Sequence, residues 1–201
     1  MSYSGKKTVA LTLPYVVWMA MMFFLPPTPE CYAARTLSVL MLLIPCFIYL
    51  VRHQAIIHSN RRLGDTLLWG AVAGFAVAFI WVWPEQFEFY RRWFIIGEGG
   101  TDAVDESSMA LKLVRLAGSA FVISVAEEMF FRRWLMKYAG FWWMVALFAV
   151  EHDRYLVGAA AGAIYGFVAM RKGLTAAIIA HVLTNLLLGL YVLQTGYWRF
   201  W

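Results

Sequence analysis

Charge is scarce in this chain: only 14% of its 201 residues are Asp, Glu, Lys or Arg, whereas 62% are hydrophobic. Cysteine is nearly absent as well. Cys31 lies in a loop and Cys46 in an apolar segment, and their spacing predicts neither a disulfide nor a metal site. Soluble domains are roughly 45–50% apolar, so the composition argues against an ordinary soluble domain and favours a protein surrounded by lipid.

Long apolar runs take the place of a polar surface. Most have a length near that of a bilayer-crossing helix, and seven can be delimited: 8–26, 37–52, 66–83, 108–137, 140–152, 155–170 and 174–194. The polar connection at about 84–107 holds aromatic residues typical of a helix lying on the membrane surface: Phe87, Phe89, Tyr90, Trp93 and Phe94. The sequence therefore predicts an all-α, polytopic transmembrane bundle of about seven helices plus one interfacial helix.

Basic residues orient the predicted bundle, because cytoplasmic loops carry an excess of Lys and Arg. With the N-terminus inside, the inner side holds Lys6, Lys7, Arg52, Arg61, Arg62, Arg132, Arg133, Lys137, Arg171 and Lys172. The outer side holds fewer, namely Arg35, Arg91, Arg92, Arg154 and Arg199, while Lys112 and Arg115 are expected to snorkel to the outer interface. A cytoplasmic N-terminus follows. The basic residues form no stripe, so nucleic-acid binding is not predicted.

Small residues recur at a helical interval in two segments. Gly158, Gly162 and Gly166 are spaced by four in the sixth segment, and Gly70 and Gly74 repeat that interval in the third. Small residues at this spacing let helix backbones approach closely in lipid. We therefore predict tight packing of both helices against their neighbours.

Three groups of polar residues interrupt the apolar segments. The first is Glu127-Glu128 with Arg132, the second pairs Phe148 with His152, and the third pairs His181 with Asn185, each pair one helical turn apart. Ionisable side chains inside a membrane are costly and mark functional sites by default. Each residue alone is about as easily explained by helix packing, so the inference depends on their placement together.

The spacing of these residues from the helix turns predicts that they converge. Glu127 and His152 lie at similar distances on either side of the turn near Gly140, so an antiparallel hairpin places them at one depth. At ~1.5 Å per residue, His181 lies ~12 Å beyond Gly173, with Asn185 ~6 Å deeper. If both turns lie at the inner face, all four groups share one layer.

The two adjacent glutamates receive different roles. Glu128 and Arg132 are four residues apart, the spacing of an ion pair on one helix face, which leaves Glu127 as the candidate general base. His152 at the same depth can orient and activate a water. His181 and Asn185 offer donors for the oxyanion that forms when water attacks an amide. Glu127, His152, His181 and Asn185 are thus the candidate catalytic residues, and Glu128, Arg132 and Phe148 the supporting ones.

The motifs EExxxR at 127–132, FxxxH at 148–152 and HxxxN at 181–185 resemble, in order and in helix position, those of the CAAX prenyl protease and bacteriocin-processing family, also called CPBP or Abi. The resemblance implies a glutamic-type intramembrane endopeptidase with no cofactor. By length the chain is one integrated membrane domain, which we expect to consist of N-terminal helices and the outer loop in 1–107 and the catalytic helical core in 108–201. The chain's second half further resembles a compact bacterial branch that accompanies exosortase and exopolysaccharide systems, which implies a bacterial inner membrane.

Alternatives to this interpretation remain open. Members of the family have been described as metalloproteases, so Glu127, His152 and His181 could instead bind zinc, three protein ligands being a plausible catalytic count. A non-catalytic immunity or regulatory partner of other membrane proteins is a second alternative. A proton-coupled transporter is a third, although the sequence shows no inverted repeat of the kind many transporters have. In the protease interpretation the partners are a peptide or membrane-protein substrate and the lipid bilayer.

Overall fold

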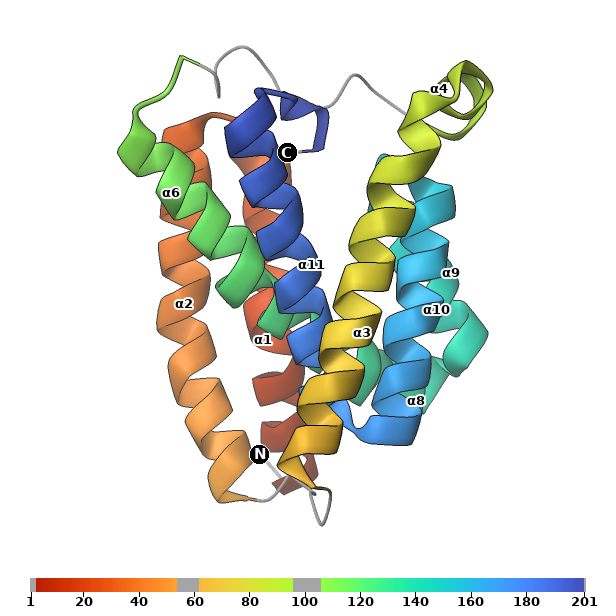
Figure 1. The fold of residues 1–201 in the computed structure, drawn as a ribbon. Helices are drawn as coiled ribbons and strands as arrows, with labels where there is room; N and C mark the ends of the chain where they lie inside the picture. Colours follow the sequence, from red (N-terminus) through yellow and green to blue (C-terminus); the bar gives the residue numbers. More distant parts are fainter. Residues whose placement is uncertain (1–2, 54–61, 96–105, 201) are drawn as a thin grey trace.

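The computed structural model describes residues 3–53, 62–95 and 106–200, and in these ranges it contains helices and no strand. The helices are α1 (Tyr3–Phe24), α2 (Pro29–Arg52), α3 (Leu63–Val82), η1 (Trp83–Gln86), α4 (Glu88–Phe94), α6 (Met109–Ala117), η2 (Gly118–Ile123), α7 (Ser124–Glu128), η3 (Met129–Leu135), α8 (Met136–Ala139), α9 (Phe141–Val150), α10 (Tyr155–Lys172), α11 (Leu174–Thr195) and η4 (Trp198–Phe200). Figure 1 shows them as a bundle with the two termini at opposite ends. The predicted all-α class is confirmed.

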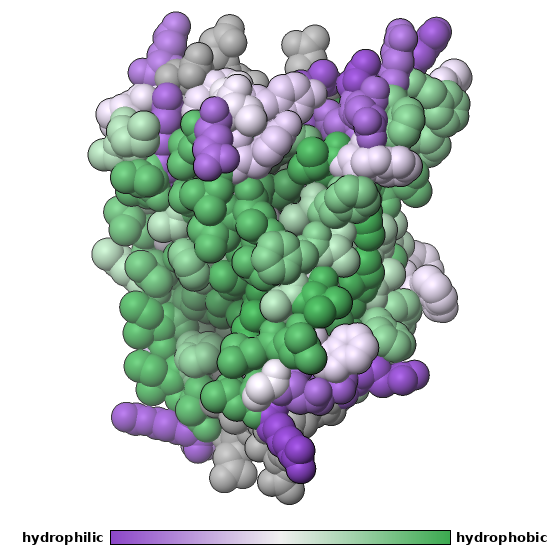
Figure 2. Space-filling view, in the orientation of Figure 1, coloured by the Kyte–Doolittle hydropathy of each residue, from purple (hydrophilic) through white to green (hydrophobic). Residues whose placement is uncertain are grey.

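Five helical stretches are long and apolar enough to cross a membrane: Ser4–Phe24, Pro29–Arg52, Leu63–Gln86, Met109–Ala139 and Leu174–Thr195. They correspond to five of the seven predicted segments. The other two segments form shorter helices, α9 with 10 residues and α10 with 18. At ~1.5 Å per residue α9 extends only ~15 Å, half the hydrocarbon thickness. In Figure 2 a wide hydrophobic band separates two hydrophilic rims, as expected of an integral membrane protein.

The interfacial aromatic segment is helical where the structure describes it. Helix α4 follows η1 at the end of α3, and its Phe89 and Trp93 side chains are exposed. The loop residues Glu98, Asp102 and Asp105, like Arg61, lie outside the described residues. Of the arginines used to orient the bundle, three are buried: Arg35, Arg132 and Arg154. They are not loop charges. Without them, the side assigned as inner still has more Lys and Arg residues than the outer side.

Close helix packing at the glycines is confirmed. A Cβ added at Gly74 would lie 2.9 Å from the backbone oxygen of Ala180, and one at Gly70 would lie 2.7 Å from Ile179 Cγ2, so α3 and α11 touch backbone to backbone. In α10, a Cβ on Gly162 would meet Phe148 at 3.1 Å and one on Gly158 would meet the Cβ of His152 at 3.3 Å. These contacts hold α3 against α11, and α10 against α9 and the turn of His152.

Replacing Gly74 by alanine is expected to lower the free energy of unfolding by about 1–3 kcal/mol. The added methyl group would press on a backbone oxygen of α11, which cannot move aside as a side chain can. Thermal unfolding in detergent measures the effect. Gly64→Ala is the matched control, because nothing lies within 4 Å of its added Cβ and helix propensity favours alanine by up to ~1 kcal/mol. A Gly74→Ala variant as stable as Gly64→Ala would contradict the close contact.

Candidate active site

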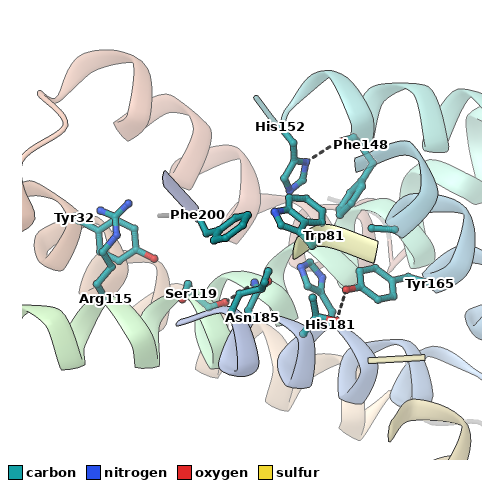
Figure 3. A pocket seen from close by; sticks show the side chains of 13 residues that line it. Tyr32, Trp81, Arg115, Ser119, Phe148, His152, Tyr165, His181, Asn185 and Phe200 are labelled. Carbon is teal, nitrogen blue, oxygen red and sulfur yellow. Dashed lines mark hydrogen bonds between the residues drawn. The ribbon is translucent and has the colours of Figure 1, made fainter. Parts of the chain in front are cut away.

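A cavity of about 200 Å³ opens beside the polar residues of the second half of the chain. Its walls come from α2, α3, α6, η2, α9, α10, α11 and the C-terminal segment, and Figure 3 shows the side chains around it. They are Tyr32, Trp81, Arg115, Ser119, Phe148, His152, Ala161, Tyr165, His181, Thr184, Asn185, Leu188 and Phe200. Three of the four candidate catalytic residues therefore line one cavity.

Glu127 and Glu128 occupy the short helix α7, between two stretches with π-helical winding, η2 and η3. Such wide turns are rare, occur frequently at functional sites, and change the direction in which neighbouring side chains point. Glu127 keeps 7% of its surface exposed and Glu128 none. Burial of both carboxylates in the membrane-spanning segment requires polar partners nearby.

The expected ion pair between Glu128 and Arg132 is present, with 2.9 Å between Oε1 and Nη1. The Arg132 guanidinium also lies 4.2 Å over the Phe148 ring and donates to the Gly162 carbonyl oxygen at 3.5 Å. Phe148 is almost completely buried. Glu128, Arg132 and Phe148 thus join η3, α9 and α10 around the site, as supporting residues would.

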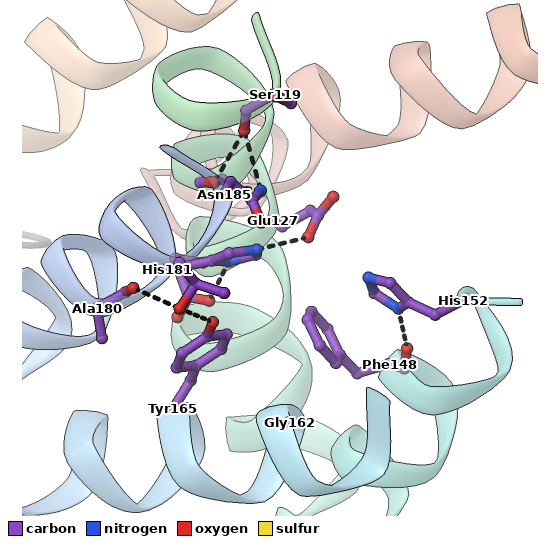
Figure 4. A network of polar contacts seen from close by, with 12 residues as sticks. Ser119, Glu127, Phe148, His152, Gly162, Tyr165, Ala180, His181 and Asn185 are labelled. Carbon is purple, nitrogen blue, oxygen red and sulfur yellow. Dashed lines mark hydrogen bonds and ion pairs between the residues drawn. The ribbon is translucent and has the colours of Figure 1, made fainter. Parts of the chain in front are cut away.

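His181 connects the two glutamates, a contact that helix spacing did not reveal. Its Nδ1 lies 2.9 Å from Glu128 Oε1, and its Nε2 lies 3.6 Å from Glu127 Oε2. The Tyr165 ring stacks on the imidazole at 4.8 Å. Because the first contact occupies Nδ1, Nε2 is the nitrogen turned toward Glu127 (Figure 4). Glu128 therefore orients His181 as well as pairing with Arg132.

Asn185 is held by residues that sequence reasoning assigned no role. Its Nδ2 donates to the Ser119 carbonyl oxygen at 3.1 Å and to Ser124 Oγ at 3.0 Å. At the preceding residue of α11, Tyr165 donates to Thr184 Oγ1 at 2.7 Å, and the single hydrogen of the Thr184 hydroxyl is shared between the Gly74 and Ala180 carbonyl oxygens. Serine and threonine are too common in membrane helices to signal such contacts.

His152 lies in the irregular turn between α9 and α10. Its Nδ1 is 2.7 Å from the Phe148 carbonyl oxygen, and its ring meets Trp81 edge to face at 5.4 Å. Figure 4 shows the ring directed toward the side where Glu127 and His181 meet. The predicted convergence is thus confirmed as geometry, whereas the catalytic roles of the four residues stay a prediction.

The zinc alternative finds no support in the geometry of the donor groups. Within 3–53, 62–95 and 106–200, no group of three or more His, Cys, Asp or Glu side chains is arranged to hold a metal ion. Glu127, His152 and His181 as placed do not form such a group, and His181 Nδ1 already contacts Glu128. No chemical step is therefore derived through a metal.

The Arg115 guanidinium lies 4.5 Å from the centre of the Tyr32 ring, and both side chains line the cavity. Arg115 is four residues before Ser119, so both lie on one face of the α6–η2 helix. The cavity wall therefore carries a positive charge one turn from the level of Asn185.

The fold and this arrangement define a polytopic membrane protein with a buried polar site. Residues 109–187 match the model of the family described as type II CAAX prenyl endopeptidase Rce1-like. The match contains all seven candidate site residues and confirms the resemblance to CAAX proteases over this region. It supports the interpretation of the chain as a membrane protease. No curated protein and no solved structure gives a significant match.

Proposed function

We propose that the protein is an intramembrane endopeptidase of the CAAX-protease type, in which Glu127 and His152 activate water. The observation that carries the proposal is the meeting of His152, His181 and Asn185 around one cavity, with Glu127 in contact with His181. A carboxylate base, an imidazole to orient water and two donors for an oxyanion are the groups that amide hydrolysis needs. The family match over the same residues supports the same reaction.

In this mechanism the substrate carbonyl lies beside His181 and Asn185, with a water between Glu127 and His152. Glu127 takes a proton from the water while the water oxygen bonds to the carbonyl carbon of the substrate. Asn185 Nδ2 donates a hydrogen bond to the resulting oxyanion, the substrate oxygen replacing one of the two acceptors that Asn185 now has. His181 adds a second hydrogen bond from Nε2 in the form protonated on both ring nitrogens, because Nδ1–H already donates to Glu128. The carbon–nitrogen bond then breaks, and Glu127 returns the proton to the leaving amine.

The central experiment is cleavage of hydrophobic and prenylated tail peptides in liposomes by wild type and His152→Ala, with and without a chelator. We expect cleavage that the substitution lowers by at least about 100-fold and that the chelator leaves unchanged. Chelator-sensitive cleavage would replace the proposal by the zinc-dependent enzyme. If wild type cleaves no peptide and His152→Ala keeps full cellular effect, the protein is a non-catalytic partner or a transporter.

Arg115 provides a prediction about the substrate. A guanidinium in the cavity wall favours a peptide that presents a carboxylate near the scissile bond, and charge-assisted hydrogen bonds are worth about 1.5–3 kcal/mol. Amidating the peptide's C-terminus should therefore raise KM about 10-fold or more for wild type and leave it unchanged for Arg115→Gln. Arg92→Gln, an exposed arginine on α4, is the control. Equal KM values for both peptides with wild type would contradict this prediction.

The membrane and its orientation belong to the same proposal. We place the chain in a bacterial inner membrane with its N-terminus in the cytoplasm, because the inner loops hold most of the basic residues. The cavity, which includes Phe200 and the early α2 residue Tyr32, then lies toward the outer side. A functional link to an exosortase or exopolysaccharide system would supply a substrate on that side.

A further inference from the structure

Regular helix structure does not hold His152 in place. Residues 151–154 form an irregular turn between α9 and α10, in which the His152 amide donates to the Ala149 carbonyl oxygen at 3.1 Å. Within the described residues the ring has one hydrogen bond, between Nδ1 and the Phe148 carbonyl oxygen. A water-orienting group must be kept within a fraction of an ångström of its productive position, so a second element has to fix this turn.

The end of α3 and the following η1 supply that element. Trp81 packs its ring edge to face against His152, and Glu85 forms an ion pair with Arg154. Trp81 and Glu85 are four residues apart and lie on one helix face, while their contacts are two residues apart in the turn. One face of α3–η1 therefore holds the turn on both sides of residue 153.

The ion pair is buried and its carboxylate is fully used. Glu85 and Arg154 are each only 5% exposed. Oε1 of Glu85 accepts from Arg154 Nε, and Oε2 accepts from the Tyr197 hydroxyl at 3.0 Å. Burial, and then the nearby Glu85 carboxylate, raises the pKa of Tyr197, so the hydroxyl keeps its proton and remains the donor. A buried ion pair is weak evidence for stability, since apolar residues can do as well.

Tyr197 brings the C-terminal segment, Tyr197–Phe200, to the same place. The Arg154 guanidinium lies 4.9 Å from the Phe200 ring centre, and Lys112 Nζ of α6 lies 4.8 Å from the Trp198 ring centre. Phe200 lines the site cavity and also a neighbouring cavity of about 410 Å³. Figure 3 shows it between the Tyr32–Arg115 pair and the Trp81–His152 pair. The segment thus crosses the cavity from the ion pair to α6.

We propose that Glu85, Arg154 and Tyr197 are positioning residues of the reaction: they fix the turn that carries His152, and through them the C-terminal segment helps to close the cavity. The inference rests on the proposed function only for its effect on catalysis. The contact itself predicts a change at position 152 whether or not a peptide is cleaved. Two measurements separate these statements.

The first measurement is a double-mutant cycle between Arg154→Met and His152→Ala, with peptide cleavage as readout. Because a misplaced catalytic group costs up to about 100-fold, we expect Arg154→Met to lower kcat by about 10–100-fold and to leave KM within about twofold. In the His152→Ala background the same substitution should change kcat by less than about twofold, since residues that act as a unit are non-additive. Equal losses in both backgrounds, or no loss in either, would overturn the proposal.

Matched variants complete the cycle. Lys172→Met removes the exposed ion pair with Asp65, which joins α3 to the other end of α10, and should leave kcat unchanged. Tyr197→Phe removes only the hydrogen bond to Glu85 and should lower kcat by less than Arg154→Met does. A Tyr197→Phe enzyme indistinguishable from wild type would overturn the part of the proposal that assigns a role to the C-terminal segment.

The second measurement needs no substrate. In a chain carrying Cys31→Ser, Cys46→Ser and His152→Cys, the thiol at position 152 reports the order of the turn through its alkylation rate. Adding Arg154→Met should raise that rate by at least about 5-fold, because local opening governs access to buried groups, whereas adding Lys172→Met should not change it. An unchanged rate with Arg154→Met would overturn the proposal. A raised rate, together with a wild type that cleaves no peptide, would keep the positioning contact and reject the proposed function.

Discussion

Replacing Glu127 by glutamine is expected to lower kcat for peptide cleavage by about 10²–10⁴-fold, the contribution of a positioned general base. Glutamine has nearly the same shape as glutamate but cannot accept the proton of the attacking water. Glu127 is buried and faces His181 Nε2 at 3.6 Å, and the amide of a glutamine fits in the same space. KM and thermal stability should therefore stay close to the wild-type values, and the loss should appear in kcat.

Single-turnover cleavage of a labelled peptide in liposomes, at saturating enzyme, measures this effect separately from binding. Asp65→Asn is the matched control, because Asp65 is half-exposed at the far end of α3 and forms an ion pair with Lys172. A Glu127→Gln enzyme that retains more than about a tenth of wild-type kcat would remove Glu127 as the base and leave Glu128 as the next carboxylate to test.

Replacing Arg132 by methionine is expected to lower the free energy of unfolding by about 3–5 kcal/mol, the usual cost of leaving a buried charge without its partner. Glu128 has no exposed surface, and its Oε1 accepts from both Arg132 and His181 at 2.9 Å. Without the guanidinium, only His181 remains to balance the charge. Arg132 also packs over Phe148, so its loss opens the contact between η3 and α9.

Thiol labelling during unfolding, or thermal melting in detergent, measures this loss of stability. Lys172→Met is the control, since an exposed ion pair of this kind contributes about 0–1 kcal/mol. A double variant, Arg132→Met with Glu128→Gln, should regain part of the stability because no charge is then left buried. If Arg132→Met costs no more than Lys172→Met, the Glu128–Arg132 pair does not support the site.

Local spacing predicted much of the site. The helical repeat of 3.6 residues places side chains four apart on one face, which is why the pairing of Glu128 with Arg132 could be predicted. Similar distances from a turn predicted that Glu127 and His152 lie at one depth. The same reasoning could not find Ser119, Ser124 or Tyr165, because their roles come from contacts with α11, more than fifteen residues away along the chain.

Packing decides points that the sequence leaves open. The fifth and sixth apolar segments form α9 and α10, neither of which is among the five candidate membrane spans of the described residues. Apolarity indicates burial in lipid or in protein without distinguishing the two. The sequence places Arg154 among the outer loop charges, but it is buried, paired with Glu85 and close to the Phe200 ring. A long basic side chain can extend to the membrane interface or pack inside the bundle, and the residues around it determine which.

The sequence by itself indicated that lipid surrounds this protein, that its fold is helical, and which residues are candidates for hydrolytic chemistry. It could do so because hydropathy and helical spacing are local properties of the chain. The tertiary structure decided which of these residues touch. It placed His181 between two carboxylates and tied the turn of His152 to Glu85, 67 positions earlier. Contacts of that kind depend on how helices pack across the bundle, and neither charge nor periodicity records them.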